Sequence, residues 1–178
     1  RLKITYSREV ELLDTGGGLL KAKPFLQNDA FIVINTDPLI DLNLAAHIDF
    51  HRKSAAAVTL VLRPDNRADE YGSMDIDANS RICRFLDSRA PFNPAGAPVK
   101  LMFTGVQVLD PIVFDHMENH AAARKFSTTK HIYPRMLVDG ARLFGFRFDG
   151  FWQDLGTAAR IREAEAKLSN GHARLHYL

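Results

Sequence analysis

The sequence predicts an α/β fold in which a mostly parallel, mixed sheet is flanked by helices. An apolar run at residues 31–35, of the kind that fills a buried strand, is followed by a helical pattern at 41–53 and a second apolar run at 57–62. A strand, a helix and a strand over this length form one right-handed crossover unit, which brings two strands into the same direction. The chain has 178 residues, of which 46% are apolar, so residues 1–178 are expected to form a single domain.

The amino-terminal part predicts a strand at residues 2–6, a polar and glycine-rich connection at 9–18, and a short helix at 19–26. The helix after the first apolar run is expected to begin at Asp41, because an aspartate side chain accepts hydrogen bonds from the free N–H groups of a first helical turn.

The middle of the chain predicts a hairpin at an edge of the main sheet, with strands at 73–77 and 81–87. Residues 88–99 contain three prolines and no apolar period, which is typical of a loop that covers a site. Gly140 favours a helix end before it, and Thr157 favours a helix start after it. The remaining pattern predicts strands at 101–109 and 143–148 and helices at 111–119, 132–139 and 158–168.

Composition excludes several classes of protein. The net charge is +2 with both signs interspersed, so the basic stripe of a nucleic-acid binder is missing and no such partner is expected. Cys83 is the only cysteine, which rules out an internal disulfide and favours a reducing cytoplasm. No signal peptide opens the chain, and no apolar run approaches the roughly 18 residues of a membrane helix, so no membrane partner is expected.

Two aspartates occupy positions that favour ligand binding. Asp37 follows the apolar run at 31–35, and open α/β sheets bind ligands beyond the carboxyl ends of their strands. A carboxylate there can coordinate Mg²⁺, which takes one or two carboxylates together with substrate phosphates. Asp154 lies between Trp152 and Gly156, in a tight corner that can direct an acid into a cleft. For both residues the competing interpretation is an ordinary turn aspartate.

Other patterns leave alternatives open. Thr15 and the three glycines at 16–18 could bring backbone N–H groups close to a ligand, or could form a flexible turn. Asp75 and Asp77 are spaced like the D-x-D that binds manganese in many glycosyltransferases, although a solvent-facing strand is the simpler interpretation. Five scattered arginines could meet phosphates but are expected to solvate the surface: Arg63, Arg67, Arg81, Arg84 and Arg89. Three histidine pairs at i,i+4 could seat zinc but are expected on exposed helix faces: His47/His51, His116/His120 and His172/His176.

Five short segments follow one another along the chain in an order that can be compared with that of known families. They are L-D-T-G-G-G at 13–18, N-T-D at 35–37, Y-G at 71–72, F-T-G-V at 103–106 and F-W-Q-D-L-G-T at 151–157. From about residue 12 to 168 this order resembles the sugar-1-phosphate nucleotidyltransferase family, especially its mannose-1-phosphate guanylyltransferase-like and N-acetylmuramate-phosphate uridylyltransferase-like members. The resemblance implies a Rossmann-like nucleotidyltransferase fold.

The resemblance also implies a role for each matched residue. Asp37 and Asp154 are implied to be catalytic by jointly holding Mg²⁺. The residues implied to contact the nucleotide are Thr15, Gly16, Gly17 and Asn35. The residues implied to contact the sugar and its phosphate are Tyr71, Gly72, Asp87, Arg89, Thr104, Gly105 and Trp152. The implied partners are a nucleoside triphosphate and a sugar 1-phosphate, and a homo-oligomer is possible.

Two departures from the family pattern stand out. The family's G-G-x-G-T-R-L loop, which binds the triphosphate, has no counterpart in the chain. We expect it upstream of residue 1, so that this chain lacks the first β-α units of the fold and is a poor catalyst alone. The family's E-K-P is D-S-R at 87–89, which keeps a carboxylate for the sugar hydroxyls and leaves Arg89 as the candidate for the lysine's role.

The implied reaction is attack of a sugar-1-phosphate oxygen on the α-phosphorus of a nucleoside triphosphate, with release of pyrophosphate. One alternative is a glycosyltransferase that binds metal through Asp75 and Asp77 and releases a nucleoside diphosphate. Another is a non-catalytic module that binds a nucleotide sugar, which Ser88 in place of the family lysine favours. The base and the sugar are not encoded in these motifs.

Overall fold

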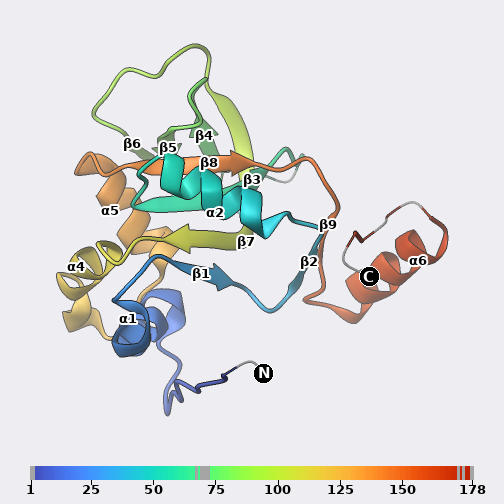
Figure 1. Ribbon diagram of the computed structural model, residues 1–178, viewed down its shortest axis with the longest axis horizontal. Helices are drawn as coiled ribbons and strands as arrows, with labels where there is room; N and C mark the ends of the chain where they lie inside the picture. The colour runs from blue at the N-terminus through green and yellow to red at the C-terminus, as the bar shows by residue number, and fades with distance from the viewer. Residues whose placement is uncertain (1–2, 67, 69–72, 172, 174, 177–178) are drawn as a thin grey trace.

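A curled seven-stranded sheet forms the centre of the fold (Figure 1). Its strands are β1 (Phe31–Ile34), β3 (Val58–Arg63), β4 (Ser73–Ile76), β5 (Ile82–Phe85), β6 (Ser88–Arg89), β7 (Val99–Leu109) and β8 (Leu143–Arg147). They follow the order β6-β5-β4-β7-β3-β8, and β1 pairs with β7. A separate two-stranded ribbon joins β2 (Pro38–Ile40) to β9 (Trp152–Asp154). The computed structural model describes residues 3–66, 68, 73–171, 173 and 175–176.

Helices cover both faces of this sheet. They are α1 (Asp14–Leu26), α2 (Leu44–Lys53), α4 (Val113–Glu118), η1 (Ala121–Ala123), η2 (Thr128–Ile132), α5 (Tyr133–Val138) and α6 (Ala158–Ser169). Of these, α2 lies on the side of Thr59, and α4 and α5 lie on the side of Leu60 and Leu62. Helix α2 lies across β3, β7 and β8, α5 contacts β5 and β6, and α1 contacts α4. Figure 1 shows α6 beside the β2–β9 ribbon, away from the main sheet. None of the described helices has both the length and the apolar composition that a bilayer crossing requires.

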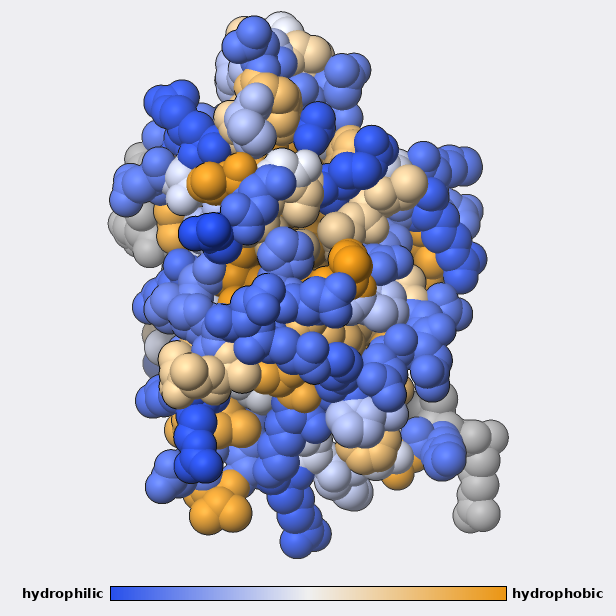
Figure 2. Space-filling model, turned by 90° about the vertical axis from the view of Figure 1, so that its left-hand side faces the viewer, coloured by the Kyte–Doolittle hydropathy of each residue, from blue (hydrophilic) through white to orange (hydrophobic). Residues whose placement is uncertain are grey.

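The side of the molecule that carries α4 and α5 is mostly hydrophilic. Figure 2 shows apolar residues there as scattered spots among polar side chains. Below this surface the main core is formed by inward-facing residues of the sheet and of α4 and α5, among them Phe114, Tyr133 and Met136. These helices therefore cover the core and present polar groups to solvent.

Strand β7 organises the sheet because it pairs along both edges. One edge pairs first with β4 and then with β1, and the other edge pairs with β3. The change from β4 to β1 occurs at Gly105, whose φ is +89°, a conformation that glycine adopts without steric cost. At this change of partner, the middle of β7 faces the start of the β2–β9 ribbon.

The α/β class with a mixed sheet is confirmed. The β1–α2–β3 unit does run its two strands in the same direction, but β7 is inserted between them and runs against both. Among the described pairs, only β3 with β8 is parallel. Neighbouring strands are therefore mostly antiparallel, because a later strand fills the space that the crossover unit leaves open.

Strand β1 is only partly buried, although the sequence predicts a buried strand there, and β3 is buried along almost its whole length. Leu60, Val61 and Leu62 in β3 are fully buried, whereas Ile32 and Ile34 in β1 are 36% and 49% exposed. Within the described residues β1 pairs only with β7. The apolar run alone cannot distinguish a central strand from one with a free edge.

Two further predictions about the amino-terminal part are wrong. Residues 3–9 form no strand and are exposed. The helix expected at 19–26 begins at Asp14 and contains the three glycines. The cause is a long-range contact: the Gly16 and Gly17 N–H groups donate to the Phe126 carbonyl over 2.8 and 3.2 Å. A Cβ atom on Gly16 would lie 2.3 Å from the Phe126 ring, so only glycine permits this approach.

The hairpin of β4 and β5 is confirmed at the β6 end of the sheet. Its turn bends back to β8, where the Gly145 N–H donates to the Ser80 carbonyl over 2.9 Å. The proline-rich segment 88–99 begins with β6 and then packs on this turn, with the Phe92 ring 3.8 Å below the Arg81 guanidinium. The segment therefore covers the hairpin turn.

The helix start expected at Asp41 lies two residues later. Asn43 caps α2 by accepting a hydrogen bond from the Ala46 N–H over 3.0 Å. Asp41 instead accepts a hydrogen bond from the His176 N–H over 2.9 Å and contacts the His176 ring, which lowers the pKa of the Asp41 carboxyl. This contact joins the carboxyl end of the chain to the β2–β9 ribbon.

Candidate active site

A small pocket opens between β1, β7 and the β2–β9 ribbon. Its volume is about 170 Å³, and it is lined by Asn35, Asp37, Pro38, Phe103, Thr104, Gly105, Trp152 and Asp154. All of these except Pro38 and Phe103 are residues that the family resemblance selects. The fold therefore brings together groups from three segments that are far apart in the sequence.

The β2–β9 ribbon brings Asp37 and Asp154 together. Pro38 pairs with Asp154 in the antiparallel register, and the Leu155 N–H donates to the Asp37 carbonyl over 2.8 Å. Both side chains line the same pocket. Because these contacts are between backbones, the approach of the two residues does not depend on their side chains.

The Asp37 carboxylate is exposed to solvent. It has no hydrogen-bond or ion-pair partner among the residues that the structure describes. The pocket therefore contains a negative charge that the described part of the fold does not use.

The Asp154 carboxylate is held in place by two donors. The Gly156 N–H donates to Oδ1 and the Arg160 guanidinium donates through Nη1 to Oδ2, each over 2.7 Å. The Asp154 side chain is 15% exposed. An ionised carboxylate has about four acceptor positions, so two donors leave room for a further ligand. Thr157 caps α6 by accepting from the Arg160 N–H, which places Arg160 in the first turn of that helix.

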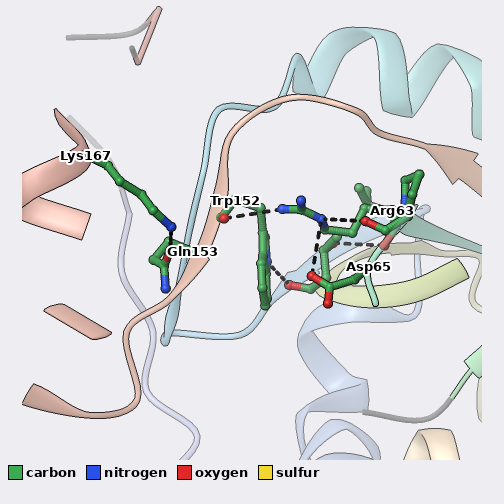
Figure 3. A network of polar contacts seen from close by, with 8 residues as sticks. Arg63, Asp65, Trp152, Gln153 and Lys167 are labelled. Carbon is green, nitrogen blue, oxygen red and sulfur yellow. Dashed lines mark hydrogen bonds and ion pairs between the residues drawn. The ribbon is translucent and has the colours of Figure 1, made fainter. Parts of the chain in front are cut away.

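Trp152 is fixed on one side of the pocket (Figure 3). Its Nε1–H donates to the Thr104 carbonyl over 2.9 Å. The Arg63 guanidinium lies 5.4 Å from the centre of the indole ring and donates to the Trp152 carbonyl over 3.3 Å. Arg63 is thus a site-supporting residue that was expected to be only a surface cation. Its position at the carboxyl end of a buried apolar strand is the signal that could have identified it, since a position near the end of an apolar run also pointed to Asp37.

Asn35 and Gly105 form the junction between β1 and β7. The Asn35 N–H donates to the Gly105 carbonyl over 2.9 Å, and a Cβ atom on Gly105 would lie 3.1 Å from Asn35 Nδ2. The Thr104 hydroxyl donates to the Val61 carbonyl over 2.9 Å and is buried. Thr104 therefore contributes its backbone rather than its hydroxyl to the pocket.

The residues expected to contact the nucleotide, apart from Asn35, lie outside this pocket. The Gly16 and Gly17 N–H groups are bonded to Phe126, and the Thr15 hydroxyl lies 3.1 Å from that of Thr128 and accepts from its N–H over 3.0 Å. Gly17 lines a different cavity, of about 390 Å³, between α1 and the segment that ends at Phe126.

Two of the residues expected to contact the sugar phosphate are also elsewhere. Asp87 lies in the tight turn between β5 and β6, Arg89 ends β6, and both are exposed. Neither lines the pocket. Tyr71 and Gly72 lie outside the described residues.

The hairpin aspartates are used by the fold. Asp75 forms a two-pronged ion pair with Arg84, whose Nε and Nη2 donate over 2.6 and 2.7 Å. Asp77 is buried and accepts three backbone N–H bonds of 2.9, 3.0 and 3.2 Å, from Asn79, Arg81 and Ala95. The predicted solvent-facing strand is therefore wrong for Asp77.

The prediction of exposed histidines is wrong for His47 and His51. Both are buried where α2 faces the sheet, and His51 Nδ1 lies 2.8 Å from the Thr59 hydroxyl. Burial lowers the pKa of His47 to about 4 and lowers the pKa of His51. No group of three or more histidine, cysteine, aspartate or glutamate residues in the described part of the chain is arranged to hold a metal ion.

Comparison with known proteins identifies the family of the chain. The family model described as "Nucleotidyl transferase" matches residues 1–171. A mannose-1-phosphate guanylyltransferase of Mycobacterium tuberculosis is 30% identical and covers 97% of this chain and 46% of its own length. A mannose-1-phosphate guanyltransferase of Candida albicans is 32% identical over 87% of the chain and 41% of its own length. A UTP–glucose-1-phosphate uridylyltransferase of Synechocystis is 25% identical over 87% and 42%. The chain spans less than half the length of these relatives.

Solved structures show the same fold. A putative glucose-1-phosphate thymidylyltransferase from Bacillus anthracis superposes with a TM-score of 0.73 at 21% identity, over 91% of this chain and 63% of the other. HddC from Yersinia pseudotuberculosis, complexed with GMP-PN, superposes with a TM-score of 0.67 at 21% identity, over 89% and 64%. Since the family model matches almost the whole sequence, the chain belongs to the nucleotidyl transferase family, among the sugar-1-phosphate nucleotidyltransferases.

Proposed function

We propose that this protein makes a nucleotide sugar from a nucleoside triphosphate and a sugar 1-phosphate and releases pyrophosphate. The observation that carries the proposal is the pocket that Asp37 and Asp154 share with Asn35, Gly105 and Trp152. The family resemblance assigns metal binding to Asp37 and Asp154, contact with the sugar phosphate to Gly105 and Trp152, and contact with the nucleotide to Asn35. The guanylyl and uridylyl transferases among the relatives support a reaction of this type.

The side chains of the pocket fit a magnesium ion. Asp37 offers a carboxylate without a described partner, and Asp154 retains acceptor positions besides those that Gly156 and Arg160 occupy. Magnesium takes one or two carboxylates and completes its shell with water and substrate phosphates, so two carboxylates are sufficient. Bound there, the ion would supply a Lewis acid and a template for the reacting phosphates.

The other residues of the pocket position the sugar phosphate. Trp152 offers a rigid aromatic surface because Thr104 and Arg63 fix it on two sides. Gly105 has no side chain, so the backbone of β7 can approach a ligand. Transfer of this type needs little covalent help from the protein, and catalysis depends on holding two anions in line and neutralising their charge.

The proposal includes weak turnover by these 178 residues alone. The family's triphosphate-binding G-x-G-T-R-L segment does not occur among them. The pocket contains the residues proposed to bind metal and sugar phosphate but not the loop that binds the triphosphate. These 178 residues alone are therefore expected to bind a sugar phosphate and to catalyse its transfer only weakly.

The glycosyltransferase alternative has less support from the structure. It needs Asp75 and Asp77 as metal ligands, and both carboxylates already accept hydrogen bonds from Arg84 or from backbone N–H groups. A metal ion on this pair would have to displace contacts that hold the hairpin together.

The test is a product assay on the protein at its full encoded length. It is incubated with Mg²⁺, each of the four common nucleoside triphosphates and a panel of sugar 1-phosphates, and pyrophosphate and nucleotide sugars are measured. Release of pyrophosphate together with a nucleotide sugar is expected, and Asp37→Asn should lower both by about a thousandfold. Release of a nucleoside diphosphate would contradict the proposal, and so would tight binding of a nucleotide sugar without any turnover.

A further inference from the structure

One of the two pocket carboxylates, that of Asp154, forms an ion pair with Arg160 of the same chain. Arg160 Nη1 lies 2.7 Å from Asp154 Oδ2, and the two side chains are 33% and 15% exposed. Asp37, which lines the same pocket, has no such partner among the described residues. The two carboxylates are therefore in different electrostatic states before any ligand binds.

Helix α6, which carries Arg160, stands to the side of the main sheet (Figure 1). Polar contacts tie it to β9: Arg160 binds Asp154, and Lys167 Nζ donates to Gln153 Oε1 over 2.8 Å (Figure 3). Ala164 is the buried residue of this helix, whereas Ile161 is 42% exposed. A helix held in this way can change one side-chain contact without repacking a core.

A guanidinium at this position opposes a divalent cation. At separations of about 4 Å two unit charges interact by about 1 kcal/mol in water and by about 4 kcal/mol at an effective dielectric constant of 20. Arg160 therefore weakens the attraction of Asp154 for a second cation as long as it stays on that carboxylate. Phosphates offer the guanidinium an equally good partner, because its planar N–H groups match two phosphate oxygens.

We propose that Arg160 couples metal binding to substrate binding: it neutralises Asp154 in the ligand-free protein and moves to a substrate phosphate when metal and substrate bind together. This inference rests on the proposed function, since it takes Asp154 as a metal ligand. It makes metal and sugar phosphate bind cooperatively, and by linkage each ligand raises the affinity of the other by the same factor. A free divalent cation is held weakly, so the site is completed only when the substrate arrives.

The test compares Arg160→Gln with Lys167→Gln. Both variants remove one positive charge from the same helix, but Lys167 contacts Gln153 and Glu163 and not Asp154. Affinity for Mg²⁺ is measured by calorimetry without substrate and again with mannose 1-phosphate. Fluorescence of Trp152, the only tryptophan of the chain, gives a second readout two residues from Asp154. Thermal melting establishes that each variant is folded.

Without substrate, Arg160→Gln should bind Mg²⁺ about threefold to tenfold more tightly than the wild type, which corresponds to loss of a partly screened repulsion. The gain in Mg²⁺ affinity that mannose 1-phosphate produces should shrink by a similar factor, and Lys167→Gln should change neither quantity. Unchanged or weaker Mg²⁺ binding in folded Arg160→Gln would overturn the inference, because Arg160 would then only orient the carboxylate.

The variant Asp154→Asn separates this inference from the proposed function. If Asp154→Asn binds Mg²⁺ as well as the wild type, Asp154 is not a metal ligand and the metal assignment fails along with the inference. If Asp154→Asn loses Mg²⁺ binding and Arg160→Gln does not gain it, the metal assignment stands and only the role of Arg160 is wrong.

Discussion

The β4–β5 hairpin and the β2–β9 ribbon each present acidic side chains, and the folded chain uses the two sets differently. Asp75 and Asp77 are two residues apart and have the D-x-D spacing of a metal motif. In the folded chain, however, Arg84 donates to the Asp75 carboxylate and three backbone N–H groups donate to that of Asp77. Asp37 and Asp154 come from distant segments, yet they line one pocket. Proximity in sequence therefore says less about a metal site than the acceptor positions that the fold leaves unused.

The largest expected effect is on turnover, when one of the two pocket carboxylates, Asp37, is replaced. Asp37→Asn should lower turnover by about a thousandfold, because a lost metal ligand removes several kcal/mol of transition-state stabilisation. The melting temperature should change by no more than about 2 °C, since the carboxylate has no described partner to lose. The measurement is a pyrophosphate-release assay beside thermal melting of the same samples.

Asp37→Glu is the matched control for this prediction. It keeps the charge and displaces it by one methylene group, so turnover should lie between that of the wild type and that of Asp37→Asn. Near-normal turnover in Asp37→Asn would show that the pocket carboxylate is not a metal ligand, and the contrast with the hairpin would lose its basis.

The converse substitution in the hairpin should affect stability. Asp77→Ala removes the acceptor of three part-buried backbone N–H groups and is expected to cost about 3 kcal/mol of unfolding free energy, because each lost hydrogen bond contributes about 1 kcal/mol. Urea denaturation measures this loss. Asp77→Asn keeps one acceptor oxygen and should cost less. An unchanged urea midpoint in Asp77→Ala would mean that these bonds do not hold the turn.

His47 is a third case, a buried polar side chain that has no hydrogen-bond partner among the described residues. Both of its ring nitrogens are buried without a hydrogen bond in the described structure, and burial lowers its pKa from 6.5 to about 4. The folded state thus favours neutral imidazole. Its contribution to stability is complete above pH 6.5 and is lost as the pH falls towards 4.

From pH 8 to pH 5 this loss should amount to about 2 kcal/mol of unfolding free energy. His47→Leu should remove this part of the acid sensitivity, because an apolar residue has no proton to bind. His116→Leu, at a half-buried position in α4, is the control and should retain it. Urea denaturation at each pH gives the comparison, and equal acid sensitivity in the wild type and His47→Leu would contradict the role of His47.

Local sequence was sufficient to identify the pocket carboxylates. Asp37 follows the apolar run at 31–35, and Asp154 lies in a corner marked by Trp152, Gly156 and a helix cap. Strand ends and tight corners are set by neighbouring residues, so the pattern records them. The family resemblance added Asn35, Thr104 and Gly105, which line the same pocket.

Local sequence was insufficient where a distant segment decides the outcome. The glycines at 16–18 indicated a loop, but the carbonyl and ring of Phe126 make them part of a helix. His47 and His51 have the spacing of an exposed helix face, but α2 turns that face to the sheet. In the same way, one of the three N–H groups that bond to Asp77 belongs to Ala95, which lies 18 residues later in the sequence.

The smallest expected effect, from Asp75→Asn, separates the two enzymatic interpretations most directly. The Asp75–Arg84 pair has two good hydrogen bonds, but both side chains are about one fifth exposed, so solvent weakens the pair and its loss should cost about 1 kcal/mol. Turnover per folded molecule should remain at the wild-type level, because the fold uses this carboxylate and the pocket does not contain it. A glycosyltransferase that binds metal through this pair would instead lose nearly all activity at unchanged stability. Turnover and urea midpoints measured on one preparation of Asp75→Asn therefore show which carboxylates carry the chemistry.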